Sequence, residues 1–269
     1  MPLFTWGYSF LRFLELRNVI IIFSLVPIIS WSFLLAGCTT SNGLRDVYVL
    51  ALSYNKGPTP TLPNPLQINN SIAQVLENQV LESRNIIQEV RVGYLSMCVV
   101  FNSGAWSCST NAQELATSIR GEGNEDPLNL LSLADMVRTR SLFYTLFIIS
   151  LAFVFLAICL LCTYPSWRDE EDSDGSVQVR PFPSRKVSYT ALALSFVASL
   201  LGFASALWQH VAAADASTVA GSLTYGMVMA RVGTTSSVLG WVATAITAIV
   251  TFGILSPILL LKVILQQTD

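Results

Sequence analysis

Two cysteines in the polar part of the chain are the residues best placed to form a covalent bond. Cys98 and Cys108 flank an apolar segment interrupted by Asn-Ser-Gly, which is typical of a three-residue hairpin loop with Gly104 in the left-handed conformation. The register of such a hairpin pairs Val100 with Trp106 and sets Cys98 opposite Cys108. Opposed residues of an antiparallel pair lie within the Cα separation that a disulfide tolerates. The spacing therefore predicts a disulfide in an oxidising compartment, with two free thiols as the alternative.

Outside this hairpin, the reactive side chains do not gather into a catalytic arrangement. His210 is the one histidine of the sequence, and the apolar blocks hold no carboxylate pair or Ser-Lys pair for acid-base or nucleophilic work. The acidic run 170–175 resembles the start of a calcium-binding loop, but Pro181 stands where the bidentate glutamate belongs. We expect this chain to have no enzyme activity, no catalytic residue, no cofactor and no dedicated metal site.

A second acidic group follows the hairpin, in a turn-rich segment. Glu122, Glu125 and Asp126 could collect calcium weakly, or they are the ordinary charged residues of a solvated loop. The solvated loop is the simpler interpretation.

The other three cysteines leave alternatives open. Cys38 follows Leu-Ala-Gly at the end of an apolar block, as in a bacterial lipoprotein signal, or it ends a retained membrane helix. Three further apolar blocks favour the retained helix, because they make a lipid anchor redundant. Cys159 and Cys162, near the expected inner membrane face, are either palmitoylated or buried core thiols.

The composition places all these residues on a membrane protein. Hydrophobic residues make up 52% of the chain and charged residues only 12%, against about 25% charged in soluble domains. With 15 Lys+Arg and 17 Asp+Glu, the chain has no strongly basic field to hold nucleic acid. The apolar residues form four blocks without Asp, Glu, Lys or Arg, each long enough to cross a hydrocarbon core of about 30 Å as a helix. We predict transmembrane helices at 19–37, 142–163, 187–208 and 235–261.

The distribution of Lys and Arg predicts the orientation. Most basic residues of the short segments lie before the first block, between the second and third, and after the fourth, whereas the segment between the third and fourth has only Arg231. Because basic residues are retained on the cytoplasmic side, we predict a multi-pass plasma-membrane protein with both termini in the cytoplasm. The cytoplasmic segments are then 1–18, 164–186 and 262–269, and the extracellular segments are 38–141 and 209–234.

The long outer segment is predicted to contain strands and short helices. Residues 46–54 are rich in β-branched and aromatic side chains and are typical of a strand. Ser71 and Gln74 form a capping box for one short helix, and Asn111 or the preceding threonine can cap another. Asn69 begins the sequon Asn-Asn-Ser and is a candidate glycosylation site.

Small residues mark one face of the third transmembrane block. They are Ser195, Ala198, Ser199, Gly202 and Ala206, at spacings close to one helical turn. Small side chains let helix backbones approach closely in lipid. We therefore predict a membrane all-α fold, a four-helix transmembrane bundle, in which this face packs within the chain or against a second copy.

Four spans with cytoplasmic ends, and a long first outer loop of strands with two cysteines, resemble the claudin superfamily. Within it, the sequence resembles the fungal mating-induced calcium-regulator and membrane-fusion proteins. The residues that carry this resemblance are 35–38 (Leu-Ala-Gly-Cys), 47–54, 91–94, 98–99 and 106–108 (Trp-Ser-Cys, with Trp106). The family pattern is glycine, two apolar residues, glycine, one apolar residue and cysteine. Gly93 and Cys98 match it, and Ser96 stands where the second glycine is expected, so a small residue is kept.

The resemblance implies a claudin-like extracellular antiparallel β-sheet and a role in calcium influx and membrane fusion during fungal mating. We expect a regulator or organiser, because the spans hold no charged side chain to line an ion path. The alternatives are a calcium channel subunit that itself conducts, and a membrane-domain or cell-wall scaffold without a calcium role. The candidate exposed contacts are Tyr94, Phe101 and Trp106, although strand alternation requires some of them to pack inward. The expected partner is a calcium-channel or fusion protein, a second copy or the opposing membrane, with membrane lipids around the spans.

Overall fold

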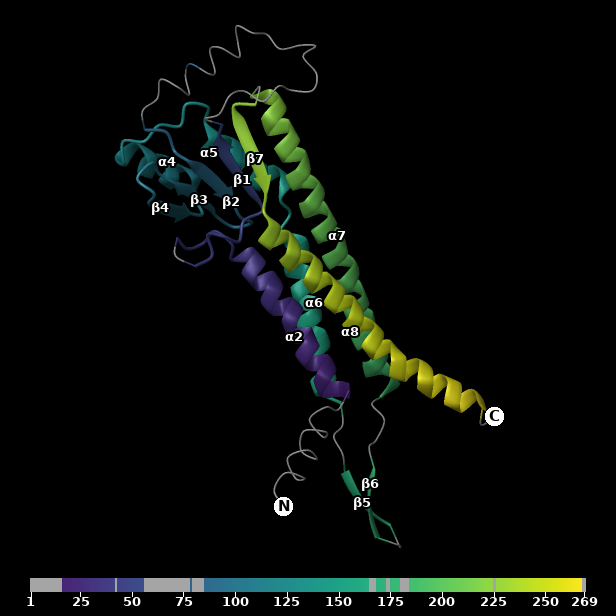
Figure 1. Cartoon of the computed structure of the whole chain (residues 1–269). Coiled ribbons are helices and arrows are strands. Elements are labelled where there is room, and N and C mark those ends of the chain that lie inside the picture. The colour runs from purple at the N-terminus through teal and green to yellow at the C-terminus, as the bar shows by residue number, and fades with distance from the viewer. Residues whose placement is uncertain are drawn as a thin grey trace, which may run out of the picture. The chain divides into compact units, whose positions relative to one another are not determined.

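The computed structural model describes residues 16–41, 43–55, 78, 85–164, 168–172, 175–179, 184–224 and 226–267. Four of the helices in these ranges are long and apolar enough to cross a membrane (Figure 1). They are α2 (Leu16–Leu35), α6 (Thr145–Cys162), α7 (Arg185–Leu223) and α8 (Thr234–Gln267). The chain divides into two compact units, one formed by 1–30, 146–203 and 242–269, the other by 31–145 and 204–241.

The first unit is a helical bundle with a small apolar core. Its core residues are Ile20, Leu161, Val250 and Ile254, from three different helices. Ser150 Oγ of α6 donates a hydrogen bond of 2.7 Å to the carbonyl oxygen of Ala198 in α7. Such a bond requires close helix approach, which the small residues of α7 allow. Ser195, Ala198 and Gly202 are buried within the chain, which confirms their predicted packing role.

The second unit is built on a five-stranded antiparallel sheet (Figure 1). Its strands are β1 (Leu50–Tyr54), β2 (Glu89–Val92), β3 (Met97–Val100), β4 (Trp106–Ser109) and β7 (Val228–Val232), in the order β4-β3-β2-β1-β7. Two helices, α4 (Ala112–Gly121) and α5 (Leu130–Ser141), pack against it, α5 on β1 and β2 and α4 on β4 and α5.

The β3–β4 hairpin has the predicted register. Val100 pairs with Trp106 and Cys98 with Cys108. The loop is closed by hydrogen bonds of 2.9 Å from Phe101 N to the carbonyl oxygen of Ala105 and from Gly104 N to that of Phe101. Gly104 has a φ of 82°, the left-handed conformation that its position in the loop requires. Asn111 also acts as predicted, since its side chain accepts a hydrogen bond from Gln113 N and caps α4.

The third transmembrane helix is longer than predicted, and the segment after it is not simply a loop. The apolar block predicted an end at Trp208, but α7 continues to Leu223 through an alanine-rich stretch with high helix propensity. Gln209 is 2% exposed within this extension, and a Cβ added to Gly240 of α8 would lie only 3.3 Å from its Oε1. Beyond α7, β7 joins the sheet at β1, so the predicted loop 209–234 supplies an edge strand.

Other differences are smaller. The first strand starts at Leu50 rather than Asp46, and α6 starts at Thr145 after a break that separates it from α5. In the predicted cytoplasmic loop, β5 (Arg168–Asp172) and β6 (Gly175–Val179) pair as a two-stranded sheet. The predicted helix at Ser71 and the sequon asparagine Asn69 lie outside the described residues.

Candidate interaction surface

The strand register sorts the residues of the sheet onto two faces. Directly opposed residues of antiparallel strands point to the same side, so each face can be followed across all five strands. One face carries two rows of aligned residues, which we call the disulfide face: Met229, Ser53, Glu89, Val100 and Trp106 in one row, and Arg231, Ala51, Arg91, Cys98 and Cys108 in the other. The opposite face carries fully buried residues such as Leu52, Val90 and Val99, and α4 and α5 cover it.

Arg91 lies at the centre of the disulfide face, between two aromatic rings. Its guanidinium carbon is 4.5 Å from the ring centroid of Trp106 and 4.8 Å from that of Tyr48. Its Nε donates to Glu89 at 2.7 Å, and its Nη1 donates to Asp46 at 2.6 Å. The planar guanidinium group of arginine can stack on rings and bind carboxylates at the same time, which the ammonium group of lysine does less well. Arg91 thereby joins β2, β4 and the segment that leads into β1.

The carboxylates stabilise the charge of this half-buried cation. Burial alone would lower the pKa of Arg91, but its hydrogen bonds to Glu89 and Asp46 outweigh that effect and raise it. The Arg91 side chain is only 16% exposed, whereas Asp46 is 71% exposed. Arg45 adds a second cation over the Trp106 ring, at 5.3 Å. The disulfide face therefore presents an aromatic and charged network rather than an apolar patch.

The disulfide fixes the strand that carries Trp106. The Cα atoms of Cys98 and Cys108 are 4.0 Å apart and their sulfurs are bonded. In the chain-entropy treatment, closing so short a loop stabilises the fold by about 3 kcal/mol. Because Cys98 pairs with Arg91 on one side and Cys108 on the other, the bond also holds β3 and β4 beside the Arg91 network.

The turn that holds Gly93 and Ser96 docks the sheet onto the chain that leaves α2. A side chain on Gly93 would come within 2.5 Å of the Gly37 carbonyl oxygen, so only glycine fits there. Ser96 is fully buried, and its hydroxyl donates a 3.0 Å hydrogen bond to the same carbonyl oxygen. The serine at the expected glycine position is thus accommodated and satisfies a carbonyl at the end of α2.

Two of the three predicted contact residues are not exposed. Phe101 is 3% exposed because it continues the alternation of Met97 and Val99 and points toward the helix-covered face. Tyr94 is 3% exposed because it belongs to the turn that docks against Gly37, and burial raises its hydroxyl pKa. The prediction of exposure was therefore wrong for both. Trp106 is partly exposed and remains on the disulfide face.

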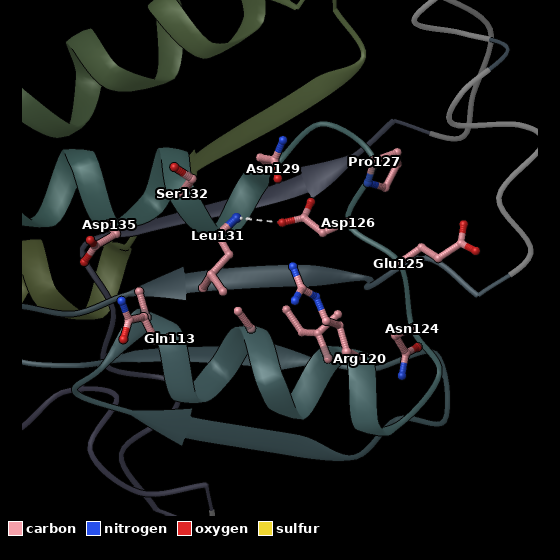
Figure 2. Close-up of a pocket in the computed structure, with 13 residues that line it drawn as sticks. Gln113, Arg120, Asn124, Glu125, Asp126, Pro127, Asn129, Leu131, Ser132 and Asp135 are labelled. Atoms are coloured by element: carbon pink, nitrogen blue, oxygen red, sulfur yellow. Dashed lines mark hydrogen bonds between the residues drawn. The ribbon is translucent and has the colours of Figure 1, made fainter.

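A cleft of about 600 Å³ lies between α4, α5 and the acidic loop that joins them (Figure 2). Asp126 at its rim is engaged in the fold: its Oδ1 accepts from Tyr54 Oη and from Leu130 N at 2.8 Å, and its Oδ2 accepts from Leu131 N at 3.0 Å. Asp126 therefore caps α5 and ties it to β1. Glu125 is exposed, and the structure brings no group of three or more possible metal ligands together among the described residues.

The sequence did not reveal the Arg91 network as a unit. Arg91 and Trp106 both lie in the motifs that carry the family resemblance, but Asp46 and Tyr48 were assigned to a strand and Glu89 was not singled out. The signal that could have revealed it was the presence of Arg91, Tyr48 and Trp106 in three of the segments that carry the resemblance, because an arginine and aromatic residues often stack. Met229 and Arg231 were not assigned to this face because β7 itself was not predicted.

Comparison with known proteins identifies the family. No curated protein matches the sequence. The family described as Ca2+ regulator and membrane fusion protein Fig1 matches residues 75–259, more than half of the chain. The match includes β2, β3, β4 and β7, the disulfide and all or most of α6, α7 and α8. That description names a regulator and a membrane fusion protein, not an enzyme. The chain belongs to the Ca2+ regulator and membrane fusion protein Fig1 family.

Proposed function

We propose that this chain regulates calcium influx and promotes membrane fusion at the plasma membrane during fungal mating, and that the disulfide face binds its partner outside the cell. The single observation that carries the mechanism is the two-row arrangement of that face, with Arg91 between Tyr48 and Trp106. Arginine and aromatic residues are the side chains most enriched where protein partners bind. The described helices α4 and α5 pack on the other side of the sheet.

The proposed orientation puts the sheet outside and both termini in the cytoplasm. The segment between the second and third spans has more Lys and Arg than the segment between the third and fourth, and this difference supports the orientation. The disulfide supports it as well, because such bonds persist in oxidising compartments. In this orientation the protein is a claudin-like four-span protein whose sheet can meet a channel protein, a fusion partner or a second copy.

A regulatory role fits the spans better than conduction by this chain alone. The four predicted spans have no Asp, Glu, Lys or Arg, and ion pathways through membrane proteins are commonly lined by charged side chains, carbonyl rings or water-filled cavities. Calcium flux into liposomes containing only the purified protein would contradict this part of the proposal. Flux that requires a second, channel-forming protein would support it.

Two matched methionines test the disulfide face directly. Met229 on that face is 50% exposed, and Met136 on α5 is 52% exposed. In cells that lack their own copy, Met229→Ser should reduce calcium uptake and mating fusion, while Met136→Ser should leave both unchanged. Surface biotinylation checks that both variants reach the plasma membrane equally. Equal activity of the two variants would show that the disulfide face is not the working surface.

A further inference from the structure

Helix α6 has two different faces although nearly all of its residues are apolar. One stripe packs inside the first unit and includes Phe147, Val154 and Leu161. The opposite stripe is exposed and carries Ile148, Ile149, Phe155 and Leu156, all more than 40% exposed. Large apolar side chains on the outside of a membrane helix face lipid, because lipid is as apolar as they are. The exposed stripe is therefore the lipid-facing side of α6.

Cys159 and Cys162 continue this stripe into the last turn of α6. Both are exposed. Cys159 lies three positions after Leu156 and four after Phe155 on the same face, and Cys162 lies three positions after Cys159. Of the two alternatives for these cysteines, that of buried core thiols is therefore wrong for both. Their surroundings contrast with those of Cys38, which is fully buried and whose thiol pKa burial raises to about 12. Cys98 and Cys108 are consumed by the disulfide.

The two thiols also lie at the end of the hydrophobic span. Cys162 is the last residue of α6 and of its apolar window. Two residues later, the carbonyl oxygen of Tyr164 accepts a 2.9 Å hydrogen bond from Nη1 of Arg17, the first residue of the apolar window of α2. Arginine side chains at span ends lie at the level of the lipid headgroups. The two thiols precede Tyr164 by five and two residues, so they lie within about one and a half helical turns of that level, on the side that faces lipid.

We propose that Cys159 and Cys162 are sites of fatty S-acylation, with a long-chain acyl-coenzyme A thioester as the donor. The cysteine sulfur, as thiolate, attacks the carbonyl carbon of the donor and forms a new thioester. The bond from that carbon to the coenzyme A sulfur breaks, and the coenzyme A thiolate takes up the proton that the cysteine lost. No oxidant or reductant takes part.

The geometry suits the product of this reaction. An acyl chain on either sulfur begins at the headgroup level and can extend into lipid along the exposed stripe of α6, next to Leu156 and Phe155. Acyl transfer from coenzyme A requires thiols on the cytoplasmic side, so the proposal depends on the orientation proposed above. Reversible thioesters close to a span end are a known form of juxtamembrane lipidation.

Thioester-specific mass tagging of the full-length protein tests the proposal. Cells expressing it are lysed in denaturant, free thiols are blocked with N-ethylmaleimide, thioesters are cleaved with neutral hydroxylamine, and the new thiols are coupled to a polyethylene glycol maleimide. We expect up to two hydroxylamine-dependent tags in the wild type, at most one in Cys159→Ser or Cys162→Ser, and none in the double variant. Cys38→Ser is the matched control and should retain the wild-type tags, because Cys38 is buried in the native fold.

A wild-type protein without hydroxylamine-dependent tags would overturn the proposal, and so would tags that persist in the double variant. Protease accessibility of an epitope at the C terminus, measured in intact and opened cells, reads the orientation separately. An external C terminus would refute the orientation and the acylation together. A cytoplasmic C terminus without tags would refute the acylation alone and leave the proposed function standing.

Discussion

The sheet and the helical bundle are stabilised in different ways. The sheet depends on a few specific contacts: the disulfide, the backbone approach of Gly93 to Gly37, and the Arg91 network. The bundle depends on many small contacts between small or apolar side chains, together with the hydrogen bond from Ser150 of α6 to the Ala198 carbonyl oxygen of α7. The difference suggests that single substitutions should disrupt the sheet far more than the bundle, which suits a surface that must keep one shape to bind a partner.

The largest effect is expected where two backbones touch. Gly93→Ala places a Cβ 2.5 Å from the Gly37 carbonyl oxygen, so the turn must move away from the end of α2. We expect a loss of several kcal/mol, of the order seen for severe backbone clashes, and retention of the protein inside the cell. Gly121→Ala is the matched control, because nothing lies within 4 Å of that position. Surface biotinylation of both variants measures the difference, and equal surface levels would contradict the docking role of Gly93.

Loss of the disulfide should have the next largest effect. Replacing both Cys98 and Cys108 with serine removes about 3 kcal/mol of loop-closure stabilisation and loosens β4 with Trp106. The four helices should still insert, since their apolar content is unchanged. Thermal unfolding of purified protein, with Cys38→Ser as the single-thiol comparison, tests this prediction. A double variant as stable as the wild type would mean that strand pairing alone holds the hairpin.

The Arg91 network should be sensitive to geometry rather than to charge. Arg91→Lys keeps the positive charge but loses the planar stacking on Trp106 and the separate bonds to Glu89 and Asp46. We expect a destabilisation of about 1–2 kcal/mol, close to the value of a charged hydrogen bond. Arg140→Lys, at an exposed position of α5, should change stability little. If the two lysine variants unfold at the same temperature, stacking contributes nothing measurable.

The bundle should show the smallest effect. Ser150→Ala removes the hydrogen bond to the Ala198 carbonyl oxygen but keeps the small volume that close packing needs. Interhelical bonds of this kind contribute about 0.6 kcal/mol on average. Ser256→Ala, which removes only a bond to a carbonyl in its own helix, is the control. In detergent, Ser150→Ala should be slightly less stable to unfolding than Ser256→Ala. A loss of stability as large as that of Gly93→Ala would refute the contrast between sheet and bundle.

Local patterns predicted much of this fold. The four helices follow from apolar length alone. Lipid offers no partner for backbone N–H and C=O groups, so a long apolar block must pair them internally, as a helix does. The hairpin register follows from the turn chemistry of Gly104, which acts over a few residues. The opposition of Cys98 and Cys108 is a consequence of that register. Prediction was weaker at helix ends, since the third block was predicted to end at Trp208 but α7 continues to Leu223.

By itself, then, the sequence determined the spans, the hairpin and the paired cysteines, because each depends on neighbours along the chain. Only the tertiary structure decided the pairing of β7 with β1, the burial of Tyr94 and Phe101, and the position of Arg91 between Tyr48 and Trp106. It also decided that Cys159 and Cys162 face outward. The physical reason is that these features depend on which distant segments meet. A periodic pattern predicts only which face of a helix or strand is buried, not which segment covers that face.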